Sequence, residues 1–181
     1  MNYAEIKYCD IANGVGVRTT LFVSGCRHGC PGCFNAAAWD FLAGKPFDTE
    51  VQHKLLESLS TPYVDGLSIL GGEPLEPENQ EALAPFLAQA KSVAPSKDIW
   101  MWTGFTWEQL MGKSRAHTSY INEILDYVDV LVDGPFVEAQ KDLTLRFRGS
   151  SNQRIIDVAE SRTREKVVLW QDEAIFSSHS W

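Results

Sequence analysis

Residues 19–33 read TTLFVSGCRHGCPGC, a short apolar run that leads directly into three closely spaced cysteines. The run Thr19–Val23 has the length and the β-branched content of a buried strand. Cys26, Cys30 and Cys33 follow on a loop that is rich in glycine and proline. Thiolates are soft ligands that select zinc or iron–sulfur centres. This stretch therefore predicts a strand that leads into a metal-binding loop.

Short apolar runs of similar length recur along the chain and alternate with helical patterns. The predicted strands are Thr19–Val23, Gly66–Leu70, Ile99–Trp102, Val130–Val132, Arg154–Ile156 and Val167–Trp170. Such runs suit the strands of a parallel sheet that is covered by helices on its faces. The chain is therefore predicted to be an α/β protein.

Three helical patterns separate these strands. Apolar residues at helical spacing predict helices over Val51–Leu59, Leu83–Val93 and Ile121–Val128. Asp48 or Thr49 is expected to cap the first helix. Pro85 must either open the first turn of the second helix or kink it, because proline lacks a backbone N–H. Repeated βα units of this kind form either a barrel or an open, doubly wound sheet.

In both architectures ligands bind at the carboxyl ends of the strands, and the unusual loops of this chain follow those ends. After the cysteine loop come Gly71-Gly72-Glu73-Pro74, Thr103-Gly104 and Asp133-Gly134-Pro135-Phe136. These four loops are expected to lie together on one rim of the sheet.

The composition is that of an ordinary globular chain. Its 181 residues fit one domain, residues 1–181, of which 157–181 form an extension without an assigned motif. A net charge of -8 argues against a nucleic-acid-binding surface. Apolar runs are too short to span a membrane, and the first residues lack the apolar segment of a secretory signal. We therefore expect a cytoplasmic protein whose four cysteines stay reduced and serve metal or redox chemistry.

The residues alone leave three interpretations of the cysteines open. A cubane iron–sulfur cluster held by three cysteines leaves one iron with an exchangeable position, as in a catalytic zinc site. A structural zinc ion would need a fourth ligand, either His28 or Cys9. An electron-carrier cluster would use all four cysteines, including Cys9. Only the first interpretation predicts a site that is open to a substrate or cofactor.

The spacing C-x3-C-x2-C, followed by Gly71-Gly72-Glu73-Pro74, resembles the two motifs of the radical S-adenosylmethionine superfamily. The resemblance implies a partial, open βα barrel with about four to six parallel strands. It implies a [4Fe-4S] cluster held by Cys26, Cys30 and Cys33, with no catalytic residue beyond the cluster and its cofactor. The residues that it assigns to S-adenosylmethionine are Gly32, Cys33, Phe34, Gly71, Gly72 and Glu73.

Two of these residues have alternative roles. The superfamily usually carries an aromatic residue just before the last cysteine, where this chain has Gly32, and here Phe34 follows Cys33 instead. Phe34 is expected either to pack near the adenine or to anchor the loop in the core. Glu73 is expected either to accept hydrogen bonds from the ammonium group of the ligand or to orient its own loop.

Four longer stretches carry a closer resemblance: Asp10–Asn35, Lys97–Gly104, Val130–Phe136 and Arg148–Gln153. Over Asp10–Ile156 the chain is similar to the anaerobic ribonucleoside-triphosphate reductase-activating proteins, a family of glycyl-radical activases. The resemblance implies reductive cleavage of S-adenosylmethionine to a 5'-deoxyadenosyl radical, which takes hydrogen from a glycine of the large anaerobic ribonucleotide reductase subunit. It also implies a low-potential electron donor, such as a flavodoxin, as a second partner.

Two alternative functions belong to the same superfamily. One is a radical enzyme that acts on a small molecule such as a deazapurine precursor, and the other is an activase of a different glycyl-radical enzyme. The sequence weakens the first, because it carries no added cluster of charged residues from which to build a pocket for a small substrate.

Overall fold

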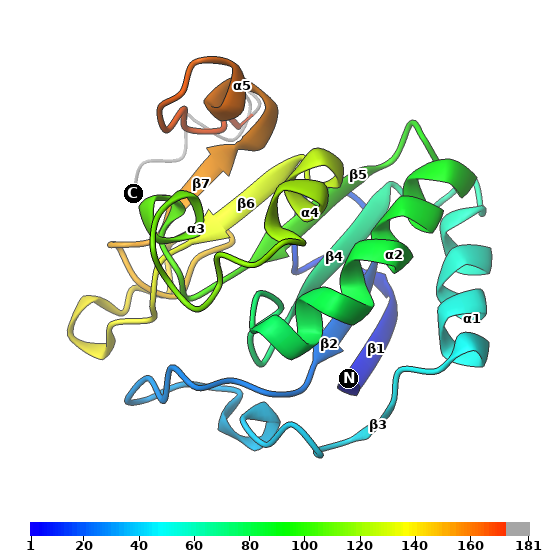
Figure 1. Cartoon of the computed structure of the whole chain (residues 1–181), viewed down its shortest axis with the longest axis horizontal. Helices are drawn as coiled ribbons and strands as arrows, with labels where there is room; N and C mark the ends of the chain where they lie inside the picture. Colours follow the sequence, from blue (N-terminus) through cyan, green and yellow to red (C-terminus); the bar gives the residue numbers. More distant parts are fainter. Residues whose placement is uncertain (173–181) are drawn as a thin grey trace.

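A sheet of seven strands forms the centre of the structure, a computed structural model that describes residues 1–172 (Figure 1). The strands are ordered β3-β1-β2-β4-β5-β6-β7. Their bounds are β1 Asn2–Asp10, β2 Arg18–Val23, β3 Lys45–Pro46, β4 Gly66–Gly71, β5 Asp98–Trp102, β6 Val130–Asp133 and β7 Arg154–Asp157. The sheet is open, because β3 and β7 end it on opposite sides.

Four strands at the centre of the sheet run parallel. β2 pairs with β4, β4 with β5 and β5 with β6. Every residue of β2 is buried, as are the first five residues of β4. Strands that are covered on both faces appear in the sequence as short continuous apolar runs. This is why the sequence pattern located them. The predicted α/β fold with an open, partial barrel is confirmed, and its four parallel strands are the lower bound of the expected number.

Both edges of the sheet are antiparallel, which the sequence patterns did not predict. β1 pairs antiparallel with β2 and β3, and β7 pairs antiparallel with β6. β1 is mostly exposed, so it lacks the apolar run that marks a buried strand. β7 follows β6 through a loop without an α-helix, and a connection without a crossover lets the chain return in the opposite direction.

The predicted extension after residue 156 begins with the end of β7 and a short helix. α5 spans Val158–Thr163. The strand predicted at Val167–Trp170 is wrong, because Leu169 makes only an isolated antiparallel bridge to Ile156. Backbone hydrogen bonds on both sides of that bridge hold this segment along β7. The last part of the predicted extension, residues 173–181, lies outside the described residues.

The three predicted helices are confirmed. The helices that connect the strands are α1 Thr49–Leu59, α2 Pro77–Val93, α3 Trp107–Met111 and α4 Ile121–Tyr127. Asp48 caps α1 by accepting a hydrogen bond of 3.0 Å from the Val51 N–H. Pro77 opens α2, so Pro85 lies inside that helix rather than in its first turn. Within residues 1–172, no helix combines the length and apolar character needed to cross a membrane.

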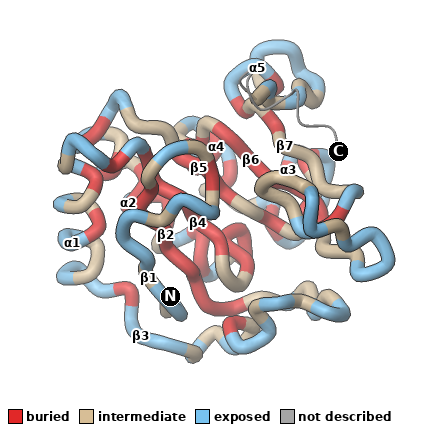
Figure 2. Tube along the Cα trace, turned by 180° about the vertical axis from the view of Figure 1, so that it is seen from behind, coloured by how far each residue is buried: buried red, intermediate tan, exposed pale blue. Residues whose placement is uncertain are grey.

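The sheet separates two apolar layers. α1, α2 and α4 lie over one face of the sheet, and the main core is packed beneath them (Figure 1). Along β5, Ile99 and Met101 belong to this core, whereas Trp100 belongs to a second cluster with Val130 and Val132. Burial is concentrated in β2, β4, β5 and β6 (Figure 2). Because these four strands are parallel, their carboxyl ends meet at one rim, where the predicted site loops begin.

Candidate metal centre

The cysteine loop leaves the carboxyl end of β2 and is fixed at its start by the segment that follows it. Gly25 and Cys26 donate backbone hydrogen bonds of 2.8 and 3.0 Å to the end of the 3-10 helix Ala36–Ala38 and to its C-cap. The predicted ligands Cys26, Cys30 and Cys33 then lie on one loop, and each is partly exposed. The structure thus holds the root of the loop in place and leaves its thiols accessible.

The donor set fits an iron–sulfur cluster. Three thiols lie on one loop, and backbone N–H groups of His28 and Gly29 hydrogen-bond the sulfur of Cys26. The backbone of Phe136 does the same for Cys30. Hydrogen bonds of this kind help set the potential of a cluster. In the part of the chain that the structure describes, no group of three or more His, Cys, Asp or Glu side chains is arranged to hold one metal ion. A cubane does not need such an arrangement, because each cysteine binds a different iron.

Burial shifts two of these thiols toward the protonated form. It raises the pKa of Cys26 to about 11, and it also raises the pKa of Cys30. The charges of Glu73 and Glu76 add to the shift at Cys26. Metal binding requires the thiolate, so assembly of a cluster on this loop must release protons.

Neither candidate for a fourth protein ligand is in place. β1 runs antiparallel to β2, with Asp10 opposite Arg18, so Cys9 lies at the end of the sheet remote from the cysteine loop. The six residues of β2 alone span roughly 17 Å. His28 is bound elsewhere, because its Nε2 lies 3.0 Å from a carboxylate oxygen of Glu73. The structure contradicts Cys9 as a fourth ligand. It places the Nε2 of His28 on Glu73, which disfavours His28 in that role.

Gly71 and Gly72 bring the second motif against the root of the cysteine loop. Gly72 donates to Val23 at 2.7 Å, and Glu73 donates to the carbonyl of Gly25 at 2.8 Å. A Cβ on Gly72 would lie 2.5 Å from that same carbonyl oxygen. Gly71 has a φ of +116°, a conformation that favours glycine. The two predicted motifs are thus joined directly through their backbones.

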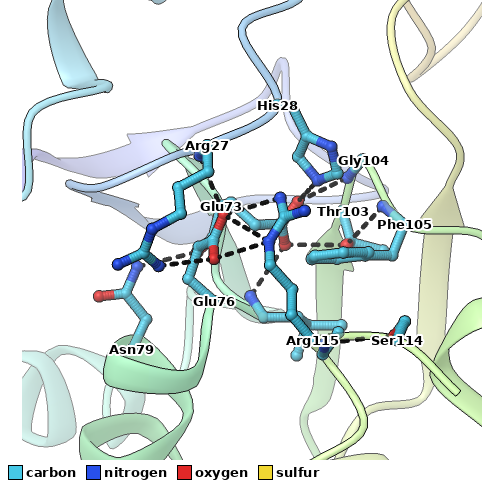
Figure 3. Close-up of polar contacts among 12 residues, drawn as sticks. Arg27, His28, Glu73, Glu76, Asn79, Thr103, Gly104, Phe105, Ser114 and Arg115 are labelled. Carbon is cyan, nitrogen blue, oxygen red and sulfur yellow. Dashed lines mark hydrogen bonds and ion pairs between the residues drawn. The ribbon is translucent and has the colours of Figure 1, made fainter.

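Glu73 is buried, with 1% of its surface exposed, and both of its carboxylate oxygens accept hydrogen bonds (Figure 3). One oxygen accepts from the Leu75 N–H and the Thr103 hydroxyl, each at 2.8 Å. The other accepts from the Gly104 N–H at 2.7 Å and contacts His28. Glu73 therefore orients its own loop and also holds the loops after β2 and β5. Its predicted contact with the ammonium group of the ligand stays a prediction.

Phe34 and Gly32 lie on the outer part of the cysteine loop. Phe34 is 87% exposed, so the prediction that it anchors the loop in the core is wrong. Its predicted contact with adenine stays a prediction. Gly32 has a φ of +70°, and a Cβ there would lie 2.6 Å from the side chain of Glu138. The loop after β6 therefore borders the cysteine loop.

Known proteins are similar to this chain over most of its length, including the segments that meet at this rim. The sequence profile of the 4Fe-4S single cluster domain family matches residues 12–156. The anaerobic ribonucleoside-triphosphate reductase-activating protein of Pasteurella multocida (strain Pm70) is 43% identical over 157 residues, which cover 86% of this chain and 96% of that protein. This chain belongs to that family of activating proteins. The Escherichia coli (strain K12) member is 39% identical over 155 residues, which cover 84% of this chain and 96% of that protein. The Enterobacteria phage T4 member is 40% identical over 157 residues, which cover 86% of this chain and 93% of that protein.

This family member carries a second buried carboxylate that the sequence analysis missed. Glu76 has no exposed surface and binds the guanidinium groups of Arg27 and Arg115 (Figure 3). Its place three residues after Glu73, at the opening of a helix, was visible in the sequence. Nothing in the sequence linked it to Arg115, which lies between α3 and α4 and is 39 residues away.

One cavity in the described part of this family member lies away from the cysteines. It has a volume of about 580 Å³ and lies between α3 and α5, with Trp107, Met111, Arg162 and Val167 among its lining residues. No residue of the cysteine loop or of Gly71–Glu73 borders it. The candidate metal centre rests on the thiols, their location and the joined motifs, and this cavity plays no part in it.

Proposed function

We propose that this chain activates an anaerobic ribonucleotide reductase by radical chemistry. When bound, a reduced [4Fe-4S] cluster supplies the electron that cleaves S-adenosylmethionine to methionine and a 5'-deoxyadenosyl radical, which takes a hydrogen atom from a glycine of the reductase. The observation that carries the proposal is the direct backbone connection between the cysteine loop and the Gly71–Glu73 loop. The match to a family of activating proteins supports assigning these joined loops to the cluster and to its cofactor.

The residues of the rim have separate roles in this proposal. Cys26, Cys30 and Cys33 hold three irons and leave the fourth open. Gly71, Gly72 and Glu73 form the loop that receives the amino end of the methionine moiety. Holding the cluster and S-adenosylmethionine on two joined loops fixes their relative orientation before the reaction. This removes part of the entropic barrier.

Gly32, Cys33 and Phe34 border the adenosyl part in this proposal. Phe34 is exposed and has a full aromatic face available for packing against adenine. A bound adenosyl group would cover that face, which otherwise lies in water. This exposure favours the adenine contact over a role in the core.

The packing of the sheet argues against a small-molecule substrate. Trp100 is 1% exposed, and Trp102, Phe147 and Trp170 pack with it on the face of the sheet opposite α1, α2 and α4. These aromatic rings occupy the space in which an open barrel would bind a small substrate. A peptide segment presented at the rim by a partner protein needs no such internal pocket.

The proposal also specifies partners, compartment and organisation. The hydrogen donor is the large subunit of an anaerobic ribonucleotide reductase, and a flavodoxin-like protein supplies the low-potential electron. We place the reaction in the cytoplasm, because this compartment keeps thiols reduced. The chain acts as a single domain, since one sheet connects β1 to β7.

The test is anaerobic reconstitution with iron and sulfide, followed by electron paramagnetic resonance with and without S-adenosylmethionine. We expect the cofactor to change the spectrum of the reduced cluster and reductant to yield 5'-deoxyadenosine. Addition of the reductase should then produce a glycyl radical. A loaded cluster that yields no 5'-deoxyadenosine would refute the radical mechanism, and 5'-deoxyadenosine without a glycyl radical would refute the choice of partner.

Matched cysteine variants test the ligand set. Cys30→Ser should abolish formation of the [4Fe-4S] cluster, because it removes one of three ligands. Cys9→Ser should retain a full complement of iron and sulfide, since Cys9 lies at the other end of β2. Iron content and the visible absorption of the cluster report both outcomes. Loss of the cluster in Cys9→Ser would contradict the open-site arrangement.

A further inference from the structure

Glu76 occupies an unusual position for a carboxylate. It is the N-cap residue of α2, yet its side chain makes no capping hydrogen bond to that helix. The side chain is fully buried, and a buried carboxylate is strongly destabilising unless it is paired and hydrogen-bonded. Burial opposes ionisation, but hydrogen bonds from Arg115 and Arg27 hold the pKa of Glu76 below its ordinary value. The chain therefore keeps a charge inside the protein at this point.

The partners of that charge lie on the cysteine loop and on the segment between α3 and α4 (Figure 3). Arg27 donates to Glu76 twice, through its backbone N–H and its Nη1, both at 2.9 Å. Arg115 donates through Nε and Nη2, both at 3.0 Å. The Arg27 guanidinium also lies 4.3 Å from the ring centroid of Phe41, and that of Arg115 lies 4.6 Å from Phe105. Glu76 thus fixes two arginines that are each packed against an aromatic ring.

The backbone bond to Arg27 connects Glu76 to the metal centre. Arg27 lies between Cys26 and His28, and His28 is itself held by Glu73. Two carboxylates three residues apart therefore hold two successive residues of the cysteine loop. The loop is thus held at the two residues that directly follow its first predicted ligand, Cys26.

We propose that Glu76 is a positioning residue for the iron–sulfur cluster. Through the Arg27 N–H it orients the chain next to Cys26, and through its buried charge it balances Arg27 and Arg115 beside the cluster. Without that charge, two guanidinium groups remain near the cluster and favour its reduced, more negative state. The inference rests on the proposed cluster ligands but not on the identity of the protein that is activated.

Two substitutions separate the reach of the side chain from its charge. Glu76→Gln keeps the length of the side chain and removes the charge, so it should favour reduction of the cluster by at least threefold. That change corresponds to about 30 mV on a scale of 59 mV per tenfold for one electron. Glu76→Asp keeps the charge and shortens the side chain by one methylene, so it should leave the potential within that margin.

Glu78→Gln is the matched control. Glu78 binds the same Arg27 at 2.5 Å, but its side chain is 51% exposed, so water screens its charge. The potential is measured by redox titration of the reconstituted cluster, followed by electron paramagnetic resonance in the absence of S-adenosylmethionine. A Glu76→Gln potential equal to that of Glu78→Gln would refute the electrostatic part of the proposal.

Amide hydrogen exchange on the protein without a cluster tests the orienting part. The Arg27 amide should exchange at least tenfold faster in Glu76→Asp than in Glu78→Gln, because only the former loses its hydrogen-bond acceptor. Equal exchange rates in the two variants would overturn this part. This measurement needs neither cofactor nor reductase, so its failure is distinguishable from a failure of the proposed activation reaction.

Discussion

Gly72 lies at the contact between the two loops of the candidate metal centre, and its lack of a side chain allows that contact. A Cβ there would lie 2.5 Å from the carbonyl oxygen of Gly25 and 2.9 Å from that of Ala38. Backbone atoms cannot rotate away as the end of a flexible side chain can. The glycine is therefore required by the approach of two protein segments to each other.

Gly72→Ala should destabilise the protein without a cluster by about 1 to 3 kcal/mol, the usual range for overpacking. Urea unfolding followed by circular dichroism measures the free energy of unfolding. Ala37→Ser, an exposed change on the adjoining 3-10 helix, should stay within about 0.5 kcal/mol of the unchanged protein. Equal stabilities of the two variants would contradict the close approach of the loops.

At the scale of single residues, the sequence was sufficient where spacing carries the chemistry. The cysteines and Gly71–Glu73 follow strand ends, so topology alone brings them to one rim. Glu76 and Arg115 were not predictable, because their pairing depends on how the α3–α4 segment folds back on the start of α2. Phe34 was misjudged as a possible core residue, since hydrophobicity alone does not tell whether an aromatic side chain on a loop is buried.

The elements of the fold differ in how strongly the sequence specifies them. Buried parallel strands such as β4 appear as short apolar runs, and they were located almost to the residue. β1 was missed because a mostly exposed strand has no such run, and β3 because it has only two residues. The direction of β7 depends on the path of the chain after β6, which no local pattern encodes.

α3 and β7 are joined by an ion pair whose strength depends on pH. Arg154 on β7 donates two hydrogen bonds, of 3.0 and 2.9 Å, to the carboxylate of Glu108 on α3. These hydrogen bonds lower the pKa of Glu108 from 4.5 to about 2. A carboxylate whose pKa is lower in the folded state than in the unfolded state stabilises the protein fully at pH values above its unfolded-state pKa. That contribution is lost as the pH falls through the folded-state pKa.

Glu108→Gln should therefore lower the free energy of unfolding above about pH 5, and the difference should shrink as the pH approaches 2. We expect less than about 1 kcal/mol, because the side chain of Glu108 is 61% exposed. Urea unfolding at a series of pH values between 3 and 7 measures the difference. Glu57→Gln on α1 controls for the loss of an exposed charge. A difference that grows at low pH would contradict the assigned pairing.

Across the whole molecule, the chain returns after α5 to cover the face of the sheet that carries no helix. The ring centroid of Trp170 lies 5.0 Å from that of Trp100, in an edge-to-face arrangement. Its backbone N–H donates to Ile155 at 2.9 Å. Trp170 thus connects the end of the described chain to the middle of the sheet.

Trp170→Ala should cost about 2 kcal/mol of stability, because it removes an aromatic contact and leaves Trp100 partly uncovered. Leu169→Ala is the neighbouring control, since Leu169 is 58% exposed and should change stability by less than about 0.5 kcal/mol. Thermal unfolding measures the stability of each variant, and the emission wavelength of tryptophan fluorescence measures the exposure of the remaining tryptophans. An unchanged emission in Trp170→Ala would show that this segment does not shield Trp100.

Because Cys9 is separated from the other cysteines, it is a site for selective chemical labelling. With the three loop thiols bound to iron, Cys9 is the remaining thiol of the four in the chain, and it lies exposed on β1. A nitroxide label at this position would lie beyond direct contact with the cluster. Its relaxation would still respond to the unpaired electron of the reduced cluster. One label would thus report reduction of the cluster, without altering any residue at the rim.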